Sequence, residues 1–166
     1  MMRYSQVETS GLAVQINKPQ SLKDLNQLIV SEGYAGTMPV FTNSEIIIDM
    51  DYVEEVVANE EGRNRNKSMD SSAIITNDSG TVKEILLVEF RFNYLNMRNL
   101  DKRALFDKVT GSINALNNPT NIHNKYIYIF NSNLKQQAIR RFRNMVPSMP
   151  TNYIAADIND LKTLYF

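Results

Sequence analysis

Cysteine and tryptophan are absent from this chain of 166 residues, and histidine occurs once. Without cysteine the chain forms no disulfide, and a single histidine does not complete a zinc site. No stretch approaches the roughly 20 consecutive apolar residues that a membrane-spanning helix needs. The first residues also lack the apolar core of a secretory signal. We therefore expect a cytoplasmic protein without a membrane partner.

An excess of either charge is also missing, because 18 basic residues balance 18 acidic ones. Domains that bind nucleic acid through bulk electrostatics usually carry a clear basic excess, so the neutral total argues against binding of that kind. The two signs are nevertheless separated along the chain. Residues 45–61 contain acids and no base, whereas residues 134–143 contain bases and no acid. The sequence therefore predicts a polarised surface.

Recognisable phosphate-binding glycine loops, nucleophile elbows and dinucleotide fingerprints are absent as well. What is present is an ordinary globular composition, with 43% hydrophobic and 22% charged residues. At this length the chain is most simply one domain, residues 1–166. Strands with intervening helices predict an α/β fold, a central mixed sheet of about four to five strands flanked by helices on both faces.

The first third of the chain gives the least regular pattern. Val14 and Ile16 suggest a short strand, and Ser21 is expected to cap a helix that ends near Gly33. Over residues 44–61 the pattern favours a helix that covers at least 51–61 and starts as early as 44, with a strand at 45–48 as the alternative.

From residue 70 onward the elements are better defined. The predicted order is a hairpin, a helix, a strand, a helix, a strand and a terminal turn capped by Asn159. Their expected ranges are 70–76 and 81–88 for the hairpin, then 101–116, 125–130, 134–145 and 152–158.

The hairpin contains the most informative residues. If the connection 77–80 has an even length, Thr76 pairs with Thr81 and Asp70 stands opposite Leu87. Asp70 then shares a sheet face with Glu89 and Arg91, one diagonal step from Glu89. An odd connection or a bulge would place Asp70 on the other face. Two carboxylates and a cation on one face are the groups that metal-assisted phosphodiester cleavage requires.

The order of a helix, a hairpin that opens with Asp, a strand ending in Glu-x-Arg, a helix and a strand resembles the PD-(D/E)XK nuclease superfamily over about residues 44–130. The resemblance implies a restriction-endonuclease-like fold with a core at about 44–158 and Mg²⁺ (or Mn²⁺) as cofactor. It implies Asp70 and Glu89 as metal ligands. A further ligand would come from Glu54 or Glu55 on the preceding helix, and Glu55 is included in the predicted metal site.

One position departs from the superfamily, because Arg91 stands where lysine is usual. Arginine is a planar cation whose pKa is too high for proton transfer. In some branches the lysine comes from the following helix, so Lys108 or Lys102 is a candidate here, and Lys108 is taken as the catalytic one. The predicted catalytic residues are Asp70, Glu89, Arg91 and Lys108. The predicted nucleic-acid-binding residues are Lys102, Arg103, Arg140 and Arg141.

These features predict a domain that hydrolyses DNA with a bound metal, in an active or impaired form, and the resemblance suggests a homodimer. The alternative is a catalytically inactive scaffold of the same fold that binds nucleic acid or protein. In that case Glu89 and Arg91 form a simple ion pair. The basic helix face at 134–143 would then be solvated and paired with the acidic segment 45–61. A third class, a toxin–antitoxin or immunity partner, would form a stable one-to-one complex.

Overall fold

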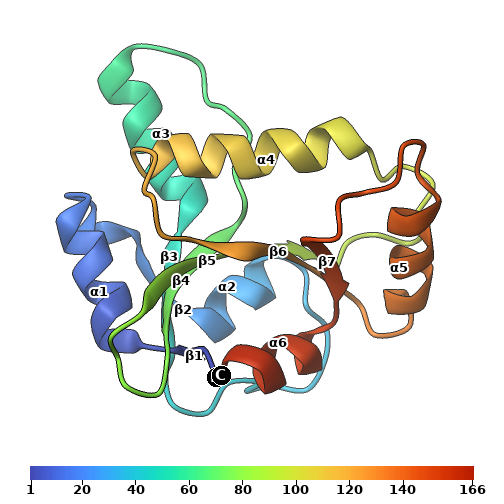
Figure 1. Ribbon diagram of the computed structural model, residues 1–166, viewed down its shortest axis with the longest axis horizontal. Coiled ribbons are helices and arrows are strands. Elements are labelled where there is room, and N and C mark those ends of the chain that lie inside the picture. Colours follow the sequence, from blue (N-terminus) through green and yellow to red (C-terminus); the bar gives the residue numbers. More distant parts are fainter.

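A mixed sheet of seven strands runs through the centre of the computed structural model, which describes residues 1–166 (Figure 1). Neighbouring strands follow the order β2-β3-β4-β5-β6-β7, and β1 also pairs with β4. The pairs from β2 to β5 are antiparallel, whereas β5, β6 and β7 are parallel. The strands are β1 (Arg3–Tyr4), β2 (Leu22–Asp24), β3 (Ile46–Asp49), β4 (Ser71–Thr76), β5 (Lys83–Arg91), β6 (Ile122–Phe130) and β7 (Tyr153–Ala156).

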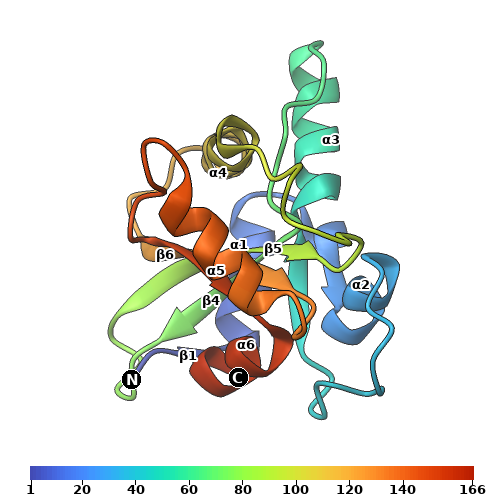
Figure 2. The ribbon, with the colours of Figure 1, turned by 90° about the vertical axis from the view of Figure 1, so that its right-hand side faces the viewer.

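Helices cover both faces of this sheet, as predicted (Figures 1 and 2). One face packs against α1, α3, α4 and α5, and the other packs against α2 and α6. The helices are α1 (Gln6–Gln15), α2 (Leu25–Ser31), α3 (Met50–Glu61), α4 (Lys102–Ala115), α5 (Lys135–Asn144) and α6 (Ile158–Tyr165), with a short 3₁₀ turn at Pro19–Ser21. The α/β class and the mixed sheet are therefore confirmed.

The expected number of four to five strands is too low. The unpredicted strands β1 and β2 contain only two and three residues, and β3, with four, corresponds to the alternative strand at 45–48. Segments this short show no measurable alternation of apolar and polar residues, so their pairing depends on tertiary contacts. Two of them, β1 and β2, come from outside the predicted core at 44–158 and join the same sheet.

The first 33 residues differ most from the prediction. Val14 lies in helix α1, not in a strand, and Ser5 caps that helix by accepting a hydrogen bond from the Glu8 N–H. This helix shows little apolar periodicity because it leaves both Val7 and Val14 exposed. Asp24, not Ser21, caps α2, since its carboxylate accepts from the Gln27 N–H at 2.9 Å.

Residues 46–61 form a strand followed directly by a helix. The helix over 51–61 is confirmed, but the early start at 44 is wrong, because Ile47 and Ile48 are buried in β3. Asp49 ends the strand and caps α3, accepting from the N–H groups of Asp51 and Tyr52. Gly62 ends α3 in the left-handed conformation, with φ of 63°. At the other end of the chain, Asp157 and not Asn159 caps α6.

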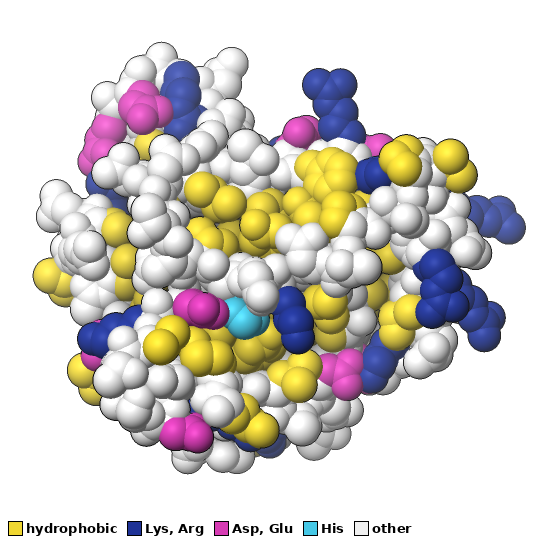
Figure 3. Space-filling model, viewed as in Figure 1, with side chains coloured by type: hydrophobic (Ala, Val, Ile, Leu, Met, Phe, Trp, Pro, Cys, Tyr) yellow, Lys and Arg dark blue, Asp and Glu magenta, His cyan; other side chains and the backbone are white.

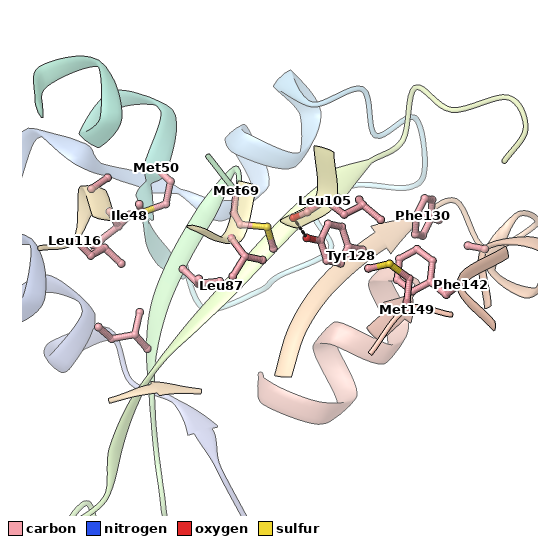
Figure 4. Close-up of a cluster of buried hydrophobic side chains, with 14 of the residues drawn as sticks. Ile48, Met50, Met69, Leu87, Leu105, Leu116, Tyr128, Phe130, Phe142 and Met149 are labelled. Carbon is pink, nitrogen blue, oxygen red and sulfur yellow. Dashed lines mark hydrogen bonds between the residues drawn. The ribbon is translucent and has the colours of Figure 1, made fainter. Parts of the chain in front are cut away.

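Helix α4 lies over the sheet face formed by β5 and β6 (Figure 1). Figure 4 shows the large side chains of the core between them. The Tyr128 hydroxyl, from β6, donates a hydrogen bond of 2.8 Å to the Leu105 carbonyl of α4. Gly111 and Ser112 attach the same helix to the segment before β4. An added Cβ at Gly111 would lie 1.8 Å from the Lys67 carbonyl oxygen, and the Met69 N–H donates to Ser112 Oγ at 2.7 Å. These contacts fix α4 next to Asp70.

Candidate active site

Asp70 and Glu89 stand opposite each other on neighbouring antiparallel strands. The ladder pairs Ser71 with Val88, so the next position places Asp70 across from Glu89. The prediction that Thr76 pairs with Thr81 is wrong, because Thr76 pairs with Lys83. Asn77 closes the longer connection through its side chain, which accepts from the Val82 N–H at 3.0 Å. The observed register differs from the predicted one by two residues. Because this shift is even, the Asp70 side chain stays on the predicted face of the sheet, the face of Glu89.

Lys108 of α4 joins the two carboxylates. Its ammonium nitrogen lies 2.8 Å from Glu89 Oε1 and 3.8 Å from Asp70 Oδ1. Lys102, the other candidate for this position, points away and donates hydrogen bonds to the carbonyls of Pro147 and Ser148. Lys108 and not Lys102 is therefore the helix lysine that reaches the predicted site.

Arg91 also faces Glu89, with its Nε 2.9 Å from Glu89 Oε1. The angle is not that of a hydrogen bond, so the contact is an ion pair without a directed N–H donor. A second nitrogen of the guanidinium donates to the Tyr94 hydroxyl at 2.6 Å, which fixes the side chain. Glu89 therefore lies between two cations from two different elements.

Burial strongly affects both carboxyl groups. Glu89 is 2% exposed and Asp70 is 6% exposed. Burial and the repulsion from Asp70 raise the pKa of Glu89 to about 8, although Lys108 and Arg91 oppose this rise. Burial also raises the pKa of Asp70, against the opposing effects of Lys108 and of the hydrogen bond of 2.5 Å that Asp70 Oδ2 accepts from the Phe90 N–H. Raised pKa values of paired carboxyl groups are typical of functional sites.

Two further acids, which were not among the predicted site residues, approach Asp70. Carboxylate oxygens of Glu32, Asp51 and Asp70 all lie within 4.8 Å of one another. Burial, followed by repulsion from Asp70 and Asp51, raises the pKa of Glu32 to about 7. Glu32 and Asp51 line a pocket of 280 Å³ between α2 and α3. Glu32 follows the last turn of α2 and Asp51 lies in the first turn of α3, so no local motif indicates that they meet.

The two glutamates proposed from the preceding helix do not join this group of three. Glu54 is fully buried, and it accepts hydrogen bonds from Arg63 and from the Asn66 N–H. Burial opposes ionisation of Glu54, but these contacts lower its pKa. Glu55 lines the same pocket as Glu32 and is exposed, with Arg65 as its nearest base at 3.9 Å. Asp51 therefore occupies the place next to Asp70 that was predicted for Glu55.

Lys and Arg side chains gather over α5, at the right of the view in Figure 3. Arg140 and Arg141 line a pocket on this side together with Arg98, and Arg103 is exposed on α4. None of these four arginines forms an ion pair within the chain. The acids of segment 45–61 that form ion pairs have other partners, which are Lys18, Lys23, Arg63 and Arg65. The alternative in which that segment neutralises the basic face is therefore wrong.

Carboxylate oxygens are the ligands that Mg²⁺ and Mn²⁺ prefer, and the cluster offers oxygen donors without sulfur or imidazole. Burial raises the pKa of Glu32 most, and repulsion from Asp70 and Asp51 adds to the rise; a divalent cation would relieve this repulsion. The donor set thus fits the predicted metal.

No helix is both long and apolar enough to cross a membrane. Comparisons with protein-family models, curated proteins and solved structures found no match.

Proposed function

We propose that this protein is a metal-dependent nuclease that hydrolyses DNA phosphodiester bonds at Asp70, Glu89 and Lys108. One observation carries the proposal: Lys108 Nζ approaches carboxylate oxygens of both Glu89 and Asp70, at 2.8 and 3.8 Å. The element order α3, β4–β5, α4, β6 also agrees with the order that the PD-(D/E)XK resemblance implies. The lysine comes from the following helix, as in some branches of that superfamily.

The residues divide into acids that would hold the cation and bases that would hold the substrate. Asp70 would hold Mg²⁺ or Mn²⁺ together with Asp51 and Glu32. Glu89, which was predicted as a metal ligand, is not in this group of three and is paired with Lys108 and Arg91 instead. A bound divalent cation supplies an activated water and offsets charge on the scissile phosphate. The ammonium group of Lys108 would donate a hydrogen bond to a phosphate oxygen or to the attacking water. The hydrogen bond to Tyr94 fixes the guanidinium of Arg91, and Arg91 would in turn orient the carboxylate of Glu89 through their ion pair.

Incubation of the purified protein with Mg²⁺ or Mn²⁺ and with supercoiled plasmid or branched DNA tests this proposal. Cleavage is expected in the wild type and is expected to be lost in Glu89→Gln, which keeps the size of the side chain. Glu61→Gln serves as the control, because Glu61 is an exposed acid at the end of α3. Circular dichroism and thermal melting establish that each variant is folded. An absence of cleavage with either metal, in a protein whose melting temperature neither metal changes, contradicts the proposal.

A second candidate, the catalytically inactive scaffold, is favoured by the charge balance at the site. Glu89 is already paired with both Lys108 and Arg91, so the site without metal is internally neutralised. Such a site would serve stability, and the protein would bind nucleic acid or protein without cutting. DNA cleavage in the presence of Mg²⁺ or Mn²⁺ distinguishes the two candidates, because the inactive scaffold cuts DNA with neither metal.

The homodimer that the resemblance suggests is a separate question. Size-exclusion chromatography with light scattering tests it.

A further inference from the structure

A groove of 700 Å³ lies between α5 and the segment that joins β5 to α4. Only one of its seven lining residues, Met97, is hydrophobic. The other six are three arginines and three side-chain amides: Arg98, Arg140, Arg141, Asn96, Gln137 and Asn144. The lining includes no carboxylate and no aromatic ring. The groove is therefore rich in N–H donors and carries three positive charges.

Those charges are free within the chain. Arg98, Arg140 and Arg141 form no ion pair, although most of the other cations in the molecule do. Arg141 donates only to the Leu100 carbonyl at 3.4 Å, and its Nε is buried without a partner. Three unpaired guanidinium groups next to one another repel each other unless an anion lies between them. The arrangement favours an anionic ligand.

The two walls of the groove are fixed in place. Met97 and Leu100 anchor the segment before α4 in the core, and Ala138 and Phe142 anchor α5 in the same cluster. The Asn131 side chain donates to the Phe92 carbonyl at 2.7 Å and so connects the two chain segments that leave the sheet. A groove with fixed walls loses little conformational entropy when a ligand binds.

The groove also lies at the end of the sheet where the candidate active site is found. Strands β5 and β6 are parallel, and Arg91 pairs with Phe130 at their carboxyl ends. The segment with Asn96 and Arg98 follows β5, and α5 follows β6. Open α/β sheets bind ligands at the carboxyl ends of their strands. A chain of phosphates that passes the site can therefore continue along this groove.

We propose that the groove lined by Arg98, Arg140 and Arg141 binds the phosphate backbone of the DNA duplex. Guanidinium groups bind phosphate oxygens through paired N–H donors. The groove has no aromatic ring on which the bases of a single strand could stack, so a duplex is the form of DNA that it fits. This inference deepens the proposed function, on which it rests for the identity of the ligand.

Fluorescence anisotropy with labelled duplexes of two unrelated sequences, measured over a series of salt concentrations without divalent cations, tests the groove. Arg98→Gln/Arg140→Gln should weaken binding to both duplexes by the same factor. It should also reduce the slope of log K against log salt by about 1.8, since each lost phosphate contact contributes about 0.9. Arg143→Gln is the matched control, because Arg143 is an unpaired arginine on α5 that lines a different pocket.

The control variant should keep the slope of the wild type. The single variant Arg98→Gln changes the charge by the same amount as Arg143→Gln. Equal losses of affinity in these two single variants would mean that only net charge matters and would overturn the groove, as would a wild type that binds neither duplex. A loss confined to one sequence would overturn backbone binding. The binding assay needs no cleavage. Duplex binding by the wild type that Arg98→Gln/Arg140→Gln weakens, together with no cleavage after Mg²⁺ or Mn²⁺ is added, would retain the groove and reject the nuclease.

Discussion

Lys108 Nζ lies 2.8 Å from Glu89 Oε1, although one residue belongs to helix α4 and the other to strand β5. The pairing depends on the position of α4 over the sheet, which the Tyr128–Leu105 hydrogen bond and the close approach at Gly111 determine. Arg91 stays beside Glu89 on the same strand. The site therefore contains one cation from the strand and one from the helix.

Replacing Lys108 with methionine should abolish nuclease activity while keeping most of the aliphatic packing of the lysine stem. We expect a loss of about 100-fold or more, the range that a positioned donor contributes. The same change removes the Lys108 charge, which is the largest effect that lowers the pKa of Glu89, so this pKa should rise further. Rates of plasmid cleavage measure the first effect, and carboxyl titration by NMR measures the second. Lys102→Met is the control, and an equal loss of cleavage there would contradict the role of Lys108.

The raised carboxyl pKa values predict how stability depends on pH. Glu89 and Glu32 have pKa values of about 8 and about 7 in the folded protein, well above those of an unfolded chain. The folded state therefore binds more protons than the unfolded state between about pH 5 and pH 8. The free energy of unfolding should fall as pH rises through this window.

Urea denaturation at several pH values across that window measures this slope. Glu54 and Asp157, whose pKa values are lowered, act only below the ordinary carboxyl range and do not oppose it. Glu89→Gln, which cannot ionise, should flatten the curve. A stability that rises toward pH 8 in the wild type would contradict the predicted protonation of these buried acids.

Much of the site follows from residues that are close in sequence. The parity of the hairpin placed Asp70 on the face of Glu89 even though the register differed by two, because an even shift leaves side chains on the same face. Helix α4 has a clear apolar stripe, so its position after β5 brought Lys108 within reach of Glu89. Local pattern was sufficient for these elements.

The rest depends on packing between distant segments. Glu32 and Asp51 are single acids at helix ends, and they approach Asp70 only because β2 and β3 add to the sheet beside β4. The resemblance implied Glu54 or Glu55, and Glu55, the one included in the predicted metal site, lies on the same helix as Asp51 but outside the group. Helix α1 was missed because its exposed valines conceal the buried stripe of Thr9, Leu12 and Ala13.

A divalent cation should raise the melting temperature, and more at about pH 8 than at about pH 6. Metal ligands must lose their protons, and Glu32, whose pKa is about 7, does so only near neutral pH or above. Thermal melting with Mn²⁺ at both pH values measures the shift. Asp51→Asn should reduce it, whereas Glu55→Gln, on the same helix but outside the group of three, should leave it unchanged. Equal reductions in the two variants would mean that the pocket merely attracts cations through its overall charge.

Gly111→Ala should destabilise the protein and reduce cleavage together, because both depend on how α4 packs against residues 66–70. The added methyl would lie 1.8 Å from the backbone oxygen of Lys67, so the helix must move. Overpacking of this kind costs about 1–3 kcal/mol of unfolding free energy. Gly11→Ala is the matched control in α1, since nothing lies within 4 Å of its Cβ, and it should stabilise by about 0.5–1 kcal/mol. Denaturation curves measure both changes. If Gly111→Ala were as stable and as active as the wild type, the contact between α4 and Lys67 would not position Lys108.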